Sequence, residues 1–282
     1  MRPSSIGVIG LGAIGGSIAW QARLAGVPRV IGYSPRSTET VQALKASAIT
    51  EAADSAARLA GLAELVVLAA PPTPTLQLIE SLATLLPPES LVTDVCSVKA
   101  PIVKQALASG LGDRFAGGHP LAGTHETGFP AARPDRFQGC VVYICETGSS
   151  RGHLAAAAVA GFWEEVLGAS PVMIEAEAHD RQLAWTSHLP QAVAYALAHA
   201  LSDQGLGGIS FGSGAKDTMR LAGSNPELWM DVLRHNAAAL SGPLQRTEKA
   251  VAELRRLLAT DDADELRRFL ETARTFRQGI GS

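Results

Sequence analysis

Gly10-Leu11-Gly12-Ala13-Ile14-Gly15 is the stretch of sequence that decides the fold. It follows a short apolar run, Ile6–Gly10, that reads as a strand, and it opens a segment of helical length and spacing. A GxGxxG motif in this context is typical of a dinucleotide-binding turn, because its glycines permit a tight turn, close approach of a pyrophosphate and packing of helix on strand. The start of the helix then offers N–H groups to phosphates. We therefore expect all six residues to bind a cofactor.

The residues around this turn predict an α/β fold with a doubly wound parallel sheet. Short runs rich in Val, Ile and Leu alternate with helical segments, as expected for strands buried on both faces. The expected strands are Ile6–Gly10, Arg29–Tyr33, Leu65–Ala70 and Leu91–Asp94, with weaker ones near Phe115–Gly118 and Val141–Cys145 and a last one at Pro171–Ile174. The expected helices between them are Ile14–Ala25, Ser37–Ala46, Thr75–Leu86 and Val98–Ala108, followed by Leu154–Leu167. Residues 1–174 are thus predicted to form a Rossmann-type domain.

The rest of the chain, residues 175–282, is predicted to be an all-α domain that binds substrate and dimerises. The stretch Leu183–Leu201 is apolar nearly all round, which is typical of a helix buried on several sides, and Pro190 should kink it or free a carbonyl. Two amphipathic segments, Pro243–Leu258 and Asp262–Phe276, follow. The apolar helix is a candidate interface for a homodimer.

Composition excludes several classes of function. The 282 residues carry 24 Lys and Arg against 27 Asp and Glu, a net charge of −3 without a basic block, so a nucleic-acid partner is not expected. The three cysteines form no CxxC pair or metal-ligand spacing, which favours a reducing compartment and no metal. The longest uncharged apolar run, Leu154–Trp163, is too short to cross a bilayer, and the N-terminus lacks a signal-peptide pattern. A cytoplasmic protein without a membrane partner is expected.

The end of the second expected strand bears on the choice of cofactor. A carboxylate there would bond the adenosine ribose of NAD, whereas this chain reads Gly32-Tyr33-Ser34-Pro35-Arg36. Ser34 removes a charge that would repel a 2′-phosphate, and Arg36 could pair with that phosphate, unless it is simply a solvated residue at a helix start. The sequence favours NADP, with NAD as the alternative. Pro71, just after the third strand, is a further expected cofactor contact.

One histidine stands out as a candidate catalytic group. His119 lies in Gly117-Gly118-His119-Pro120-Leu121-Ala122-Gly123, after a strand and at the carboxyl edge of the sheet, where Rossmann ligands bind. A plainer interpretation is a loop histidine that bonds a backbone carbonyl. Ser97, in Asp94-Val95-Cys96-Ser97-Val98-Lys99, leaves the preceding strand at the same edge and could meet His119.

Taken together, several segments resemble the prephenate/arogenate dehydrogenase family of tyrosine biosynthesis. They follow in that family's order from residue 6 to about residue 236, and GHPLAG and SHLP are the specific ones. The matching segments are Gly10–Ser17 (GLGAIGGS), Asp94–Lys99 (DVCSVK), Gly118–Gly123 (GHPLAG), His179-Asp180, Ser187–Pro190 (SHLP), Lys216–Ala222 (KDTMRLA) and Asn225–Trp229 (NPELW).

The resemblance implies an oxidative decarboxylation. Hydride leaves the ring carbon that bears the hydroxyl for the nicotinamide, CO2 departs from the opposite carbon, and the ring becomes aromatic. His119 would draw off the hydroxyl proton, and Ser97 would orient His119 or the nicotinamide amide. Arg220 matches the arginine that holds the ring carboxylate, and His188 and Lys216 would add positive potential for a dianionic substrate.

The sequence departs from many members that use prephenate at Gln191, where they carry a second histidine. A neutral amide beside the substrate's tail would tolerate the ammonium of arogenate, so the enzyme is expected to accept arogenate, with prephenate also possible. His125 is a second candidate for recognition of the tail.

Two other functions remain open from the sequence. Another dehydrogenase with a Rossmann and a helical domain, of the β-hydroxyacid or pyrroline-carboxylate reductase type, would share the turn but rely on a lysine, serine or threonine instead of His119. A non-catalytic dinucleotide sensor would keep Gly10–Gly15 and tolerate loss of His119 and Arg220.

Overall fold

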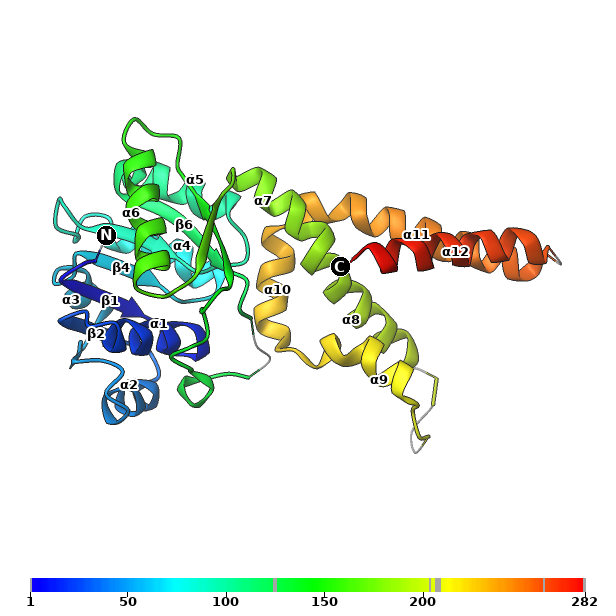
Figure 1. The fold of residues 1–282 in the computed structure, drawn as a ribbon, viewed down its shortest axis with the longest axis horizontal. Helices are drawn as coiled ribbons and strands as arrows, with labels where there is room; N and C mark the ends of the chain where they lie inside the picture. The colour runs from blue at the N-terminus through cyan, green and yellow to red at the C-terminus, as the bar shows by residue number, and fades with distance from the viewer. Residues whose placement is uncertain (1, 124–125, 203, 206–208, 261, 281–282) are drawn as a thin grey trace. The chain divides into compact units, whose positions relative to one another are not determined.

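The computed structural model describes residues 2–123, 126–202, 204–205, 209–260 and 262–280. The chain divides into two compact units, Met1–Asn236 and Ala237–Ser282. The first unit contains an eight-stranded sheet and the helices that carry the candidate site, whereas the second is a pair of helices (Figure 1).

The sheet has the order β3-β2-β1-β4-β5-β6-β7-β8. All neighbouring strands run parallel except β6 and β7, which are antiparallel. Chain order reverses between β1 and β4, and such a switch point is where Rossmann folds bind ligands. The strands are β1 (Ser5–Ile9), β2 (Arg29–Tyr33), β3 (Glu51–Ala52), β4 (Leu65–Leu68), β5 (Leu91–Asp94), β6 (Phe115–Pro120), β7 (Val141–Cys145) and β8 (Ser170–Met173).

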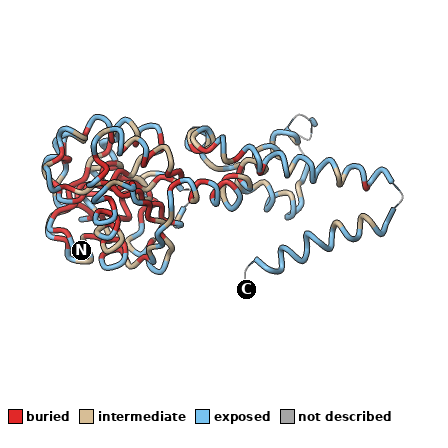
Figure 2. The backbone as a smooth tube through the Cα atoms, turned by 90° about the horizontal axis from the view of Figure 1, so that it is seen from above, coloured by how far each residue is buried: buried red, intermediate tan, exposed pale blue. Residues whose placement is uncertain are grey.

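Helices cover both faces of the sheet because its strands are apolar on both sides. In β1, Ile6 and Val8 point into one core cluster and Ile9 into the other, as the two-residue period of a strand requires. One face is covered by α1 (Ala13–Leu24), α2 (Ser37–Lys45) and α6 (Gly152–Glu165). The other is covered by α3 (Ala56–Ala60), α4 (Pro72–Leu82) and α5 (Ala100–Ala108). Figure 2 shows buried residues concentrated in this region.

The predicted fold class is confirmed, and each expected strand exists within two residues of its predicted ends. The sequence reading missed β3 and α3, which have two and five residues. Neither contains a run of large apolar residues, so periodicity gives no signal there.

A group of helices completes the first unit. They are α7 (Ala176–Leu183), α8 (Leu189–Ser202), α9 (Ser213–Met219) and α10 (Pro226–His235), with a π-helical segment Ala184–His188 between α7 and α8 and a 3-10 turn, η4 (Arg220–Gly223), after α9. Asp231 ties α10 to the start of α4, because its carboxylate accepts the Thr73 N–H at 2.8 Å and the Thr73 hydroxyl at 2.5 Å.

The helix type changes just before Pro190, whereas the predicted kink or freed carbonyl stays a prediction. Pro190 has no N–H to donate, and its ring would crowd the carbonyl four residues earlier. The chain adopts the wider π-helical turn at Ala184–His188, which ends two residues before this proline. The turn places His188 at the end of the widened segment, where its side chain is fully buried.

The prediction that the apolar helix is buried on several sides is wrong for the single chain. In α8 only Gln191 and Ala194 are buried. The remaining apolar side chains of α8 are at most partly covered by other described elements of the same unit. Covering all sides of such a helix would require a surface from outside this unit.

The second unit consists of α11 (Ala237–Ala259) and α12 (Ala263–Gly279), which pack against each other. Helix α11 begins earlier than predicted, and Pro243 lies inside it. Asp262 caps α12 as expected, since its Oδ1 accepts the Glu265 N–H at 2.9 Å. The domain boundary predicted after residue 174 stays a prediction. Within the part of the chain that is described, no helix is long and apolar enough to cross a membrane.

Candidate active site

The glycine-rich turn has the space and backbone geometry that a pyrophosphate needs. Gly10 has a φ of +95°, and a Cβ there would lie 2.2 Å from the Ala69 carbonyl oxygen. A Cβ on Gly15 would lie 1.9 Å from the Gly10 oxygen, so this position must also lack a side chain for α1 to pack on β1. By contrast, a Cβ on Gly12 would meet nothing within 4 Å. The open space at Gly12 is therefore the side from which a phosphate can approach.

The start of α1 leaves its N–H groups available. No side chain caps the helix at Gly12, and helices leave their first N–H groups without an intrahelical acceptor. The ends of β1 and β4 are joined by a bond from Ala69 N–H to the Ile9 oxygen at 2.7 Å. Pro71 is exposed just beyond, as the N-cap of α4, at the same edge of the sheet. The expected phosphate-binding residues thus fit a dinucleotide.

An acid from α2 lies beside the end of β2, and the sequence did not predict it there. Buried Ser34 donates its hydroxyl to Glu39 Oε2 at 2.6 Å, and Arg36 Nη1 lies 3.5 Å from Glu39 Oε1. The expectation that no carboxylate lies here is therefore wrong. Glu39 comes five residues after Ser34, and the first turn of α2 folds its side chain back toward the strand end.

The candidate catalytic histidine is buried and belongs to a chain of hydrogen bonds. His119 is in β6 and 9 % exposed, and its Nδ1 lies 2.8 Å from His179 Nε2. His179 is fully buried, and its Nδ1 lies 2.8 Å from Asp180 Oδ1. Burial, assisted by the charges of His179, Lys99 and His188, holds the pKa of His119 well below its usual value. Burial also lowers the pKa of His179, although the bond to Asp180 opposes it.

This chain of bonds determines which nitrogen of His119 is free. The Asp180 carboxylate also accepts the backbone N–H groups of Lys99 at 2.7 Å and Ala100 at 2.9 Å. Asp180 is therefore the acceptor, and His179 donates its Nδ1–H to it. The unprotonated Nε2 of neutral His179 must then accept a hydrogen from His119 Nδ1. By this assignment of protons, His119 Nε2 carries the lone pair and can serve as a base.

A buried ion pair supports the backbone beside His119. Lys99 and Asp94 are both fully buried, and their side chains form a salt bridge. Lys99 Nζ also donates to the Gly118 carbonyl at 2.7 Å, and the Gly118 N–H donates to Asp94 Oδ1 at 3.2 Å. The pair thus fixes both polar groups of the residue before His119. Both residues belong to the DVCSVK segment, and their charges next to a buried strand are the signal in the sequence that could have indicated this pair.

His188 lies next to this chain but is not a cation. Asn236 Nδ2 lies 2.8 Å from His188 Nδ1 and also 2.8 Å from the Asp180 carbonyl oxygen, to which it donates. Burial lowers the pKa of His188 to about 4, outweighing the opposing effect of Asp180. The expectation that His188 adds positive potential is therefore wrong near pH 7, because the fully buried imidazole is neutral. Its Nε2 is buried without a hydrogen-bond partner among the described residues.

The two polar residues expected nearest to the substrate have different surroundings. Ser97 is half-buried, and among described residues no hydrogen bond joins its side chain to His119. The partner that orients His119 is His179, a residue for which the sequence predicted no role. Gln191 is buried, and its Nε2 donates to the Leu221 carbonyl at 2.6 Å, which ties α8 to η4.

The expected cationic substrate residues are on the helices after α8. Lys216 is in α9 and Arg220 begins η4; both are exposed, and neither forms an ion pair with a described residue. Both are therefore available to an anionic ligand. His125 lies outside the described residues.

Arg136 is a further residue that the sequence reading missed. Its guanidinium donates to Ser17 Oγ of α1 at 3.0 Å and to the Ala122 carbonyl at 3.3 Å. Ala122 belongs to the GHPLAG segment, so Arg136 links that segment to the helix of the phosphate-binding turn. Burial lowers the pKa of Arg136, with a smaller contribution from Arg133.

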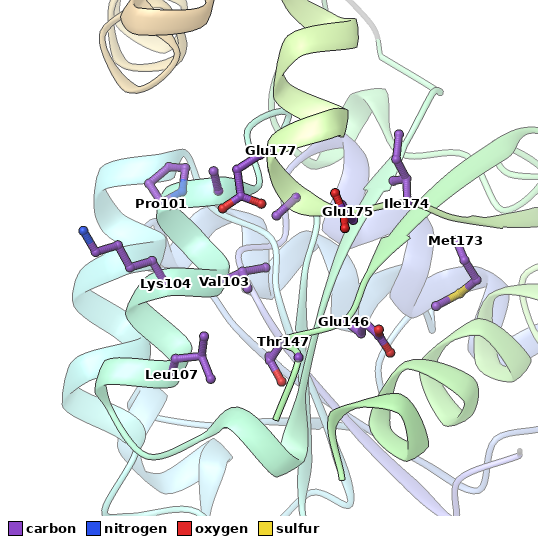
Figure 3. A pocket seen from close by; sticks show the side chains of 13 residues that line it. Pro101, Val103, Lys104, Leu107, Glu146, Thr147, Met173, Ile174, Glu175 and Glu177 are labelled. Carbon is purple, nitrogen blue, oxygen red and sulfur yellow. The ribbon is translucent and has the colours of Figure 1, made fainter. Parts of the chain in front are cut away.

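A separate hollow of about 870 Å³ lies between α5, the end of β7, the end of β8 and the start of α7 (Figure 3). Three carboxylates, Glu146, Glu175 and Glu177, and one cation, Lys104, are among its lining side chains. None of the residues predicted for the site lines it. The described residues also contain no group of three or more His, Cys, Asp or Glu that could hold a metal ion.

Comparison with known proteins gives consistent matches over nearly the whole chain. Residues 18–172 match the nucleotide-binding domain of prephenate dehydrogenase, and residues 175–272 match its dimerization domain. Prephenate dehydrogenase of Bacillus subtilis is 32% identical over 280 residues, which cover 96% of this chain and 74% of that protein.

Solved structures agree with these matches. Prephenate dehydrogenase from Aquifex aeolicus, in complex with hydroxyphenyl propionate and NAD+, has a TM-score of 0.91 at 28% identity and covers 98% of both chains. Synechocystis arogenate dehydrogenase has a TM-score of 0.79 at 31% identity and covers 98% of this chain and 100% of that one. The resemblance deduced from the sequence motifs is confirmed: the chain belongs to the prephenate dehydrogenase family.

Proposed function

We propose that the protein is a nicotinamide-dinucleotide-dependent dehydrogenase that oxidatively decarboxylates prephenate, arogenate or both. The observation that carries the proposal is the His119–His179–Asp180 chain, which leaves Nε2 of a neutral imidazole as a base. It lies at the sheet edge that also bears the phosphate-binding turn. The named relatives, a prephenate dehydrogenase and an arogenate dehydrogenase, support both substrates.

In this mechanism His119 receives a proton at Nε2 from the ring hydroxyl of the substrate. A bound nicotinamide dinucleotide supplies the acceptor for the hydride that leaves the ring carbon bearing this hydroxyl. As the proton and the hydride depart, the hydroxyl carbon becomes a carbonyl carbon, the bond to the ring carboxylate breaks, and CO2 and the aromatic phenol form. The phenol oxygen takes up a proton, which His119 can return. His179 and Asp180 stabilise the transient imidazolium through the Nδ1–H of His119.

Substrate binding is assigned to the helices after the sheet. Arg220 presents a planar fork suited to the ring carboxylate, and Lys216 adds a second positive charge. Ser97 and His188 are assigned to the same region, the latter as a buried, neutral polar group. Gln191 and His125 would contact the tail, and the neutral amide of Gln191 supports acceptance of the arogenate ammonium.

For the cofactor, we propose NADP as the preferred dinucleotide, with NAD as the alternative. Ser34 and the exposed Arg36 at the end of β2 support a contact with a 2′-phosphate. The carboxylate of Glu39 opposes it.

We further propose a homodimer in the cytoplasm. The match of residues 175–272 to a dimerization domain and the incompletely covered apolar helix α8 support the dimer. The free cysteines, two of them buried, support a reducing compartment.

The decisive experiment is an enzyme assay of the purified protein. Prephenate and arogenate are each combined with NAD and with NADP, and turnover is monitored by the absorbance of the reduced nicotinamide. We expect turnover with at least one pairing and loss of it in His119→Asn. Absence of turnover with both substrates would reject the proposal. Dinucleotide binding without turnover would favour the alternative that the protein is a non-catalytic dinucleotide sensor.

A further inference from the structure

The adenosine end of the expected cofactor site is built around one buried carboxylate. Glu39 is 8 % exposed and lies in the first turn of α2. Its two oxygens are shared between neighbours of opposite character, since Oε2 accepts the Ser34 hydroxyl at 2.6 Å and Oε1 faces the guanidinium of Arg36 at 3.5 Å. Arg36 itself is three-quarters exposed, so its far side is open to solvent or to a ligand.

The cluster formed by Ser34, Arg36 and Glu39 is directly connected to the phosphate-binding turn. The N–H of Gly10 donates to the Tyr33 carbonyl at 2.8 Å, one residue before Ser34. Strands β1 and β2 are paired up to Ile9 and Tyr33, so the cluster begins where the turn begins. In a Rossmann fold this is where the adenosine ribose lies when the pyrophosphate occupies the turn.

A second segment confines the carboxylate from the other side. Gly128 has a φ of +78°, and a Cβ there would lie 3.8 Å from Glu39 Oε1. The short helix that follows, η2 (Phe129–Ala131), packs on both α1 and α2. Glu39 therefore lies close to this segment as well as at the start of α2, in keeping with its low exposure.

We propose that Glu39 is the residue that sets the balance between NAD and NADP. Its carboxylate accepts a hydrogen bond from a ribose hydroxyl of NAD, and it opposes the 2′-phosphate of NADP by like-charge repulsion. It also competes with that phosphate for Arg36, because the guanidinium must move away from the Glu39 carboxylate to pair with the phosphate. Glu39 thus keeps NAD usable in a site that Ser34 and Arg36 would otherwise reserve for NADP. The inference rests on the proposed dinucleotide site.

The test measures binding, so it does not depend on the identity of the substrate. Dissociation constants for NAD+ and NADP+ are determined by calorimetry on wild type and Glu39→Gln, which keeps the shape of the side chain and an acceptor for Ser34. We expect the ratio of the NADP+ constant to the NAD+ constant to fall about tenfold in the variant, which corresponds to about 1.4 kcal/mol. Arg36→Ala should move the ratio in the opposite direction.

Two further measurements separate a local charge effect from other causes. Adenosine 2′-monophosphate and adenosine 5′-monophosphate serve as small probes, and Glu39→Gln should strengthen binding of the former more than the latter. Glu51→Gln is the matched control, because Glu51 of β3 is also paired with an arginine, Arg29 of β2, at 2.8 Å. It should leave the ratio unchanged.

The outcomes are distinct. A folded Glu39→Gln protein that binds both dinucleotides with the wild-type ratio overturns the inference and leaves the dinucleotide site standing. Failure of the wild type to bind either dinucleotide overturns both. If Glu39→Gln does not fold, Glu39→Asp, which withdraws the charge by one methylene, should shift the ratio in the same direction by a smaller factor, and an unchanged ratio there also overturns the inference.

Discussion

At the scale of single residues, function depends on where protons and charges are held. His119 is neutral because it is buried beside other cationic or potentially cationic groups, and its free nitrogen is selected by His179, which the Asp180 carboxylate holds directly. A histidine in the same motif but in water would lack both properties. The useful feature of His119 is therefore a property of its neighbours.

Replacing His119 by Asn should remove the base while preserving the fold around the turn. We expect kcat to fall by roughly 10²–10⁴-fold, the usual contribution of general base catalysis. Steady-state kinetics and dinucleotide binding check this together, since binding should be unchanged. A fully active His119→Asn enzyme would contradict the mechanism.

The lowered pKa of His119 makes a prediction for pH dependence. A base works when deprotonated, so a pKa below the usual 6.5 keeps His119 competent as the pH falls through that value. The acid limb of kcat/KM should therefore lie below pH 6.5. A limb at or above the ordinary histidine pKa, measured over the range in which the protein stays folded, would assign the step to another group.

His179 should act by positioning His119 and not by touching substrate. We expect His179→Ala to lower kcat more than it raises KM, and His179→Gln to recover part of the loss, because an amide oxygen can accept the His119 Nδ1–H. Nitrogen NMR of labelled histidines reports the tautomer directly. Equal kinetics for both variants, or an unchanged His119 tautomer in His179→Ala, would show that His179 only fills space.

At the scale of elements, the carboxyl edges of β5 and β6 are joined by the buried Asp94–Lys99 pair. Its bonds to both polar groups of Gly118 hold β6 in place beside the loop that leaves β5. The π-helical turn before Pro190 positions His188 in a similar way. The turn ends at His188, whose imidazole lies within hydrogen-bond distance of Asn236. Irregular or charged features thus occur where elements must be aligned for the site.

Lys99→Met should be strongly destabilising although the side chains are similar in length. It leaves the Asp94 carboxylate buried without its cation, for which the expected cost is about 3–5 kcal/mol. Urea unfolding measures the change. The double variant Lys99→Met with Asp94→Asn should recover part of the loss, because it removes the uncompensated charge, and a double variant as unstable as the sum of the two would argue against an ion pair.

At the scale of the whole molecule, apolar surface remains on the helices of the second unit. Leu270 and Phe276 of α12 are 53 % and 71 % exposed, and α12 buries none of its residues. Single exposed apolar residues are normal, whereas apolar residues that form a contiguous exposed patch are typical of an association surface. Leu270 and Phe276 are consistent with the proposed homodimer.

A dimer should therefore be sensitive to charge on α12. We expect light scattering to give about twice the 29.3 kDa chain mass for wild type, since two-fold dimers are the commonest soluble oligomers. Leu270→Glu with Phe276→Glu should shift the protein toward the monomer. Thr275→Glu, an exposed neighbour on the same helix, is the control. A monomeric wild type would reject the proposed dimer.

The sequence by itself determined the Rossmann sheet, the phosphate-binding turn and the family, because each is encoded by residues close together in the chain. Strand periodicity, glycines at fixed spacing and short motifs are local signals. It also singled out His119 and Arg220 as candidates. It placed no acid beside Ser34, and it gave His188 a charge that burial removes.

Only the tertiary structure decided how these residues act. His119 and His179 are sixty residues apart, and Asn236 bonds to His188 from the C-terminal end of α10. Glu39 accepts the Ser34 hydroxyl only because the first turn of α2 brings its side chain back to the end of β2. Hydrogen-bond partners, burial and the resulting protonation depend on contacts between distant segments, and a linear pattern does not specify such contacts.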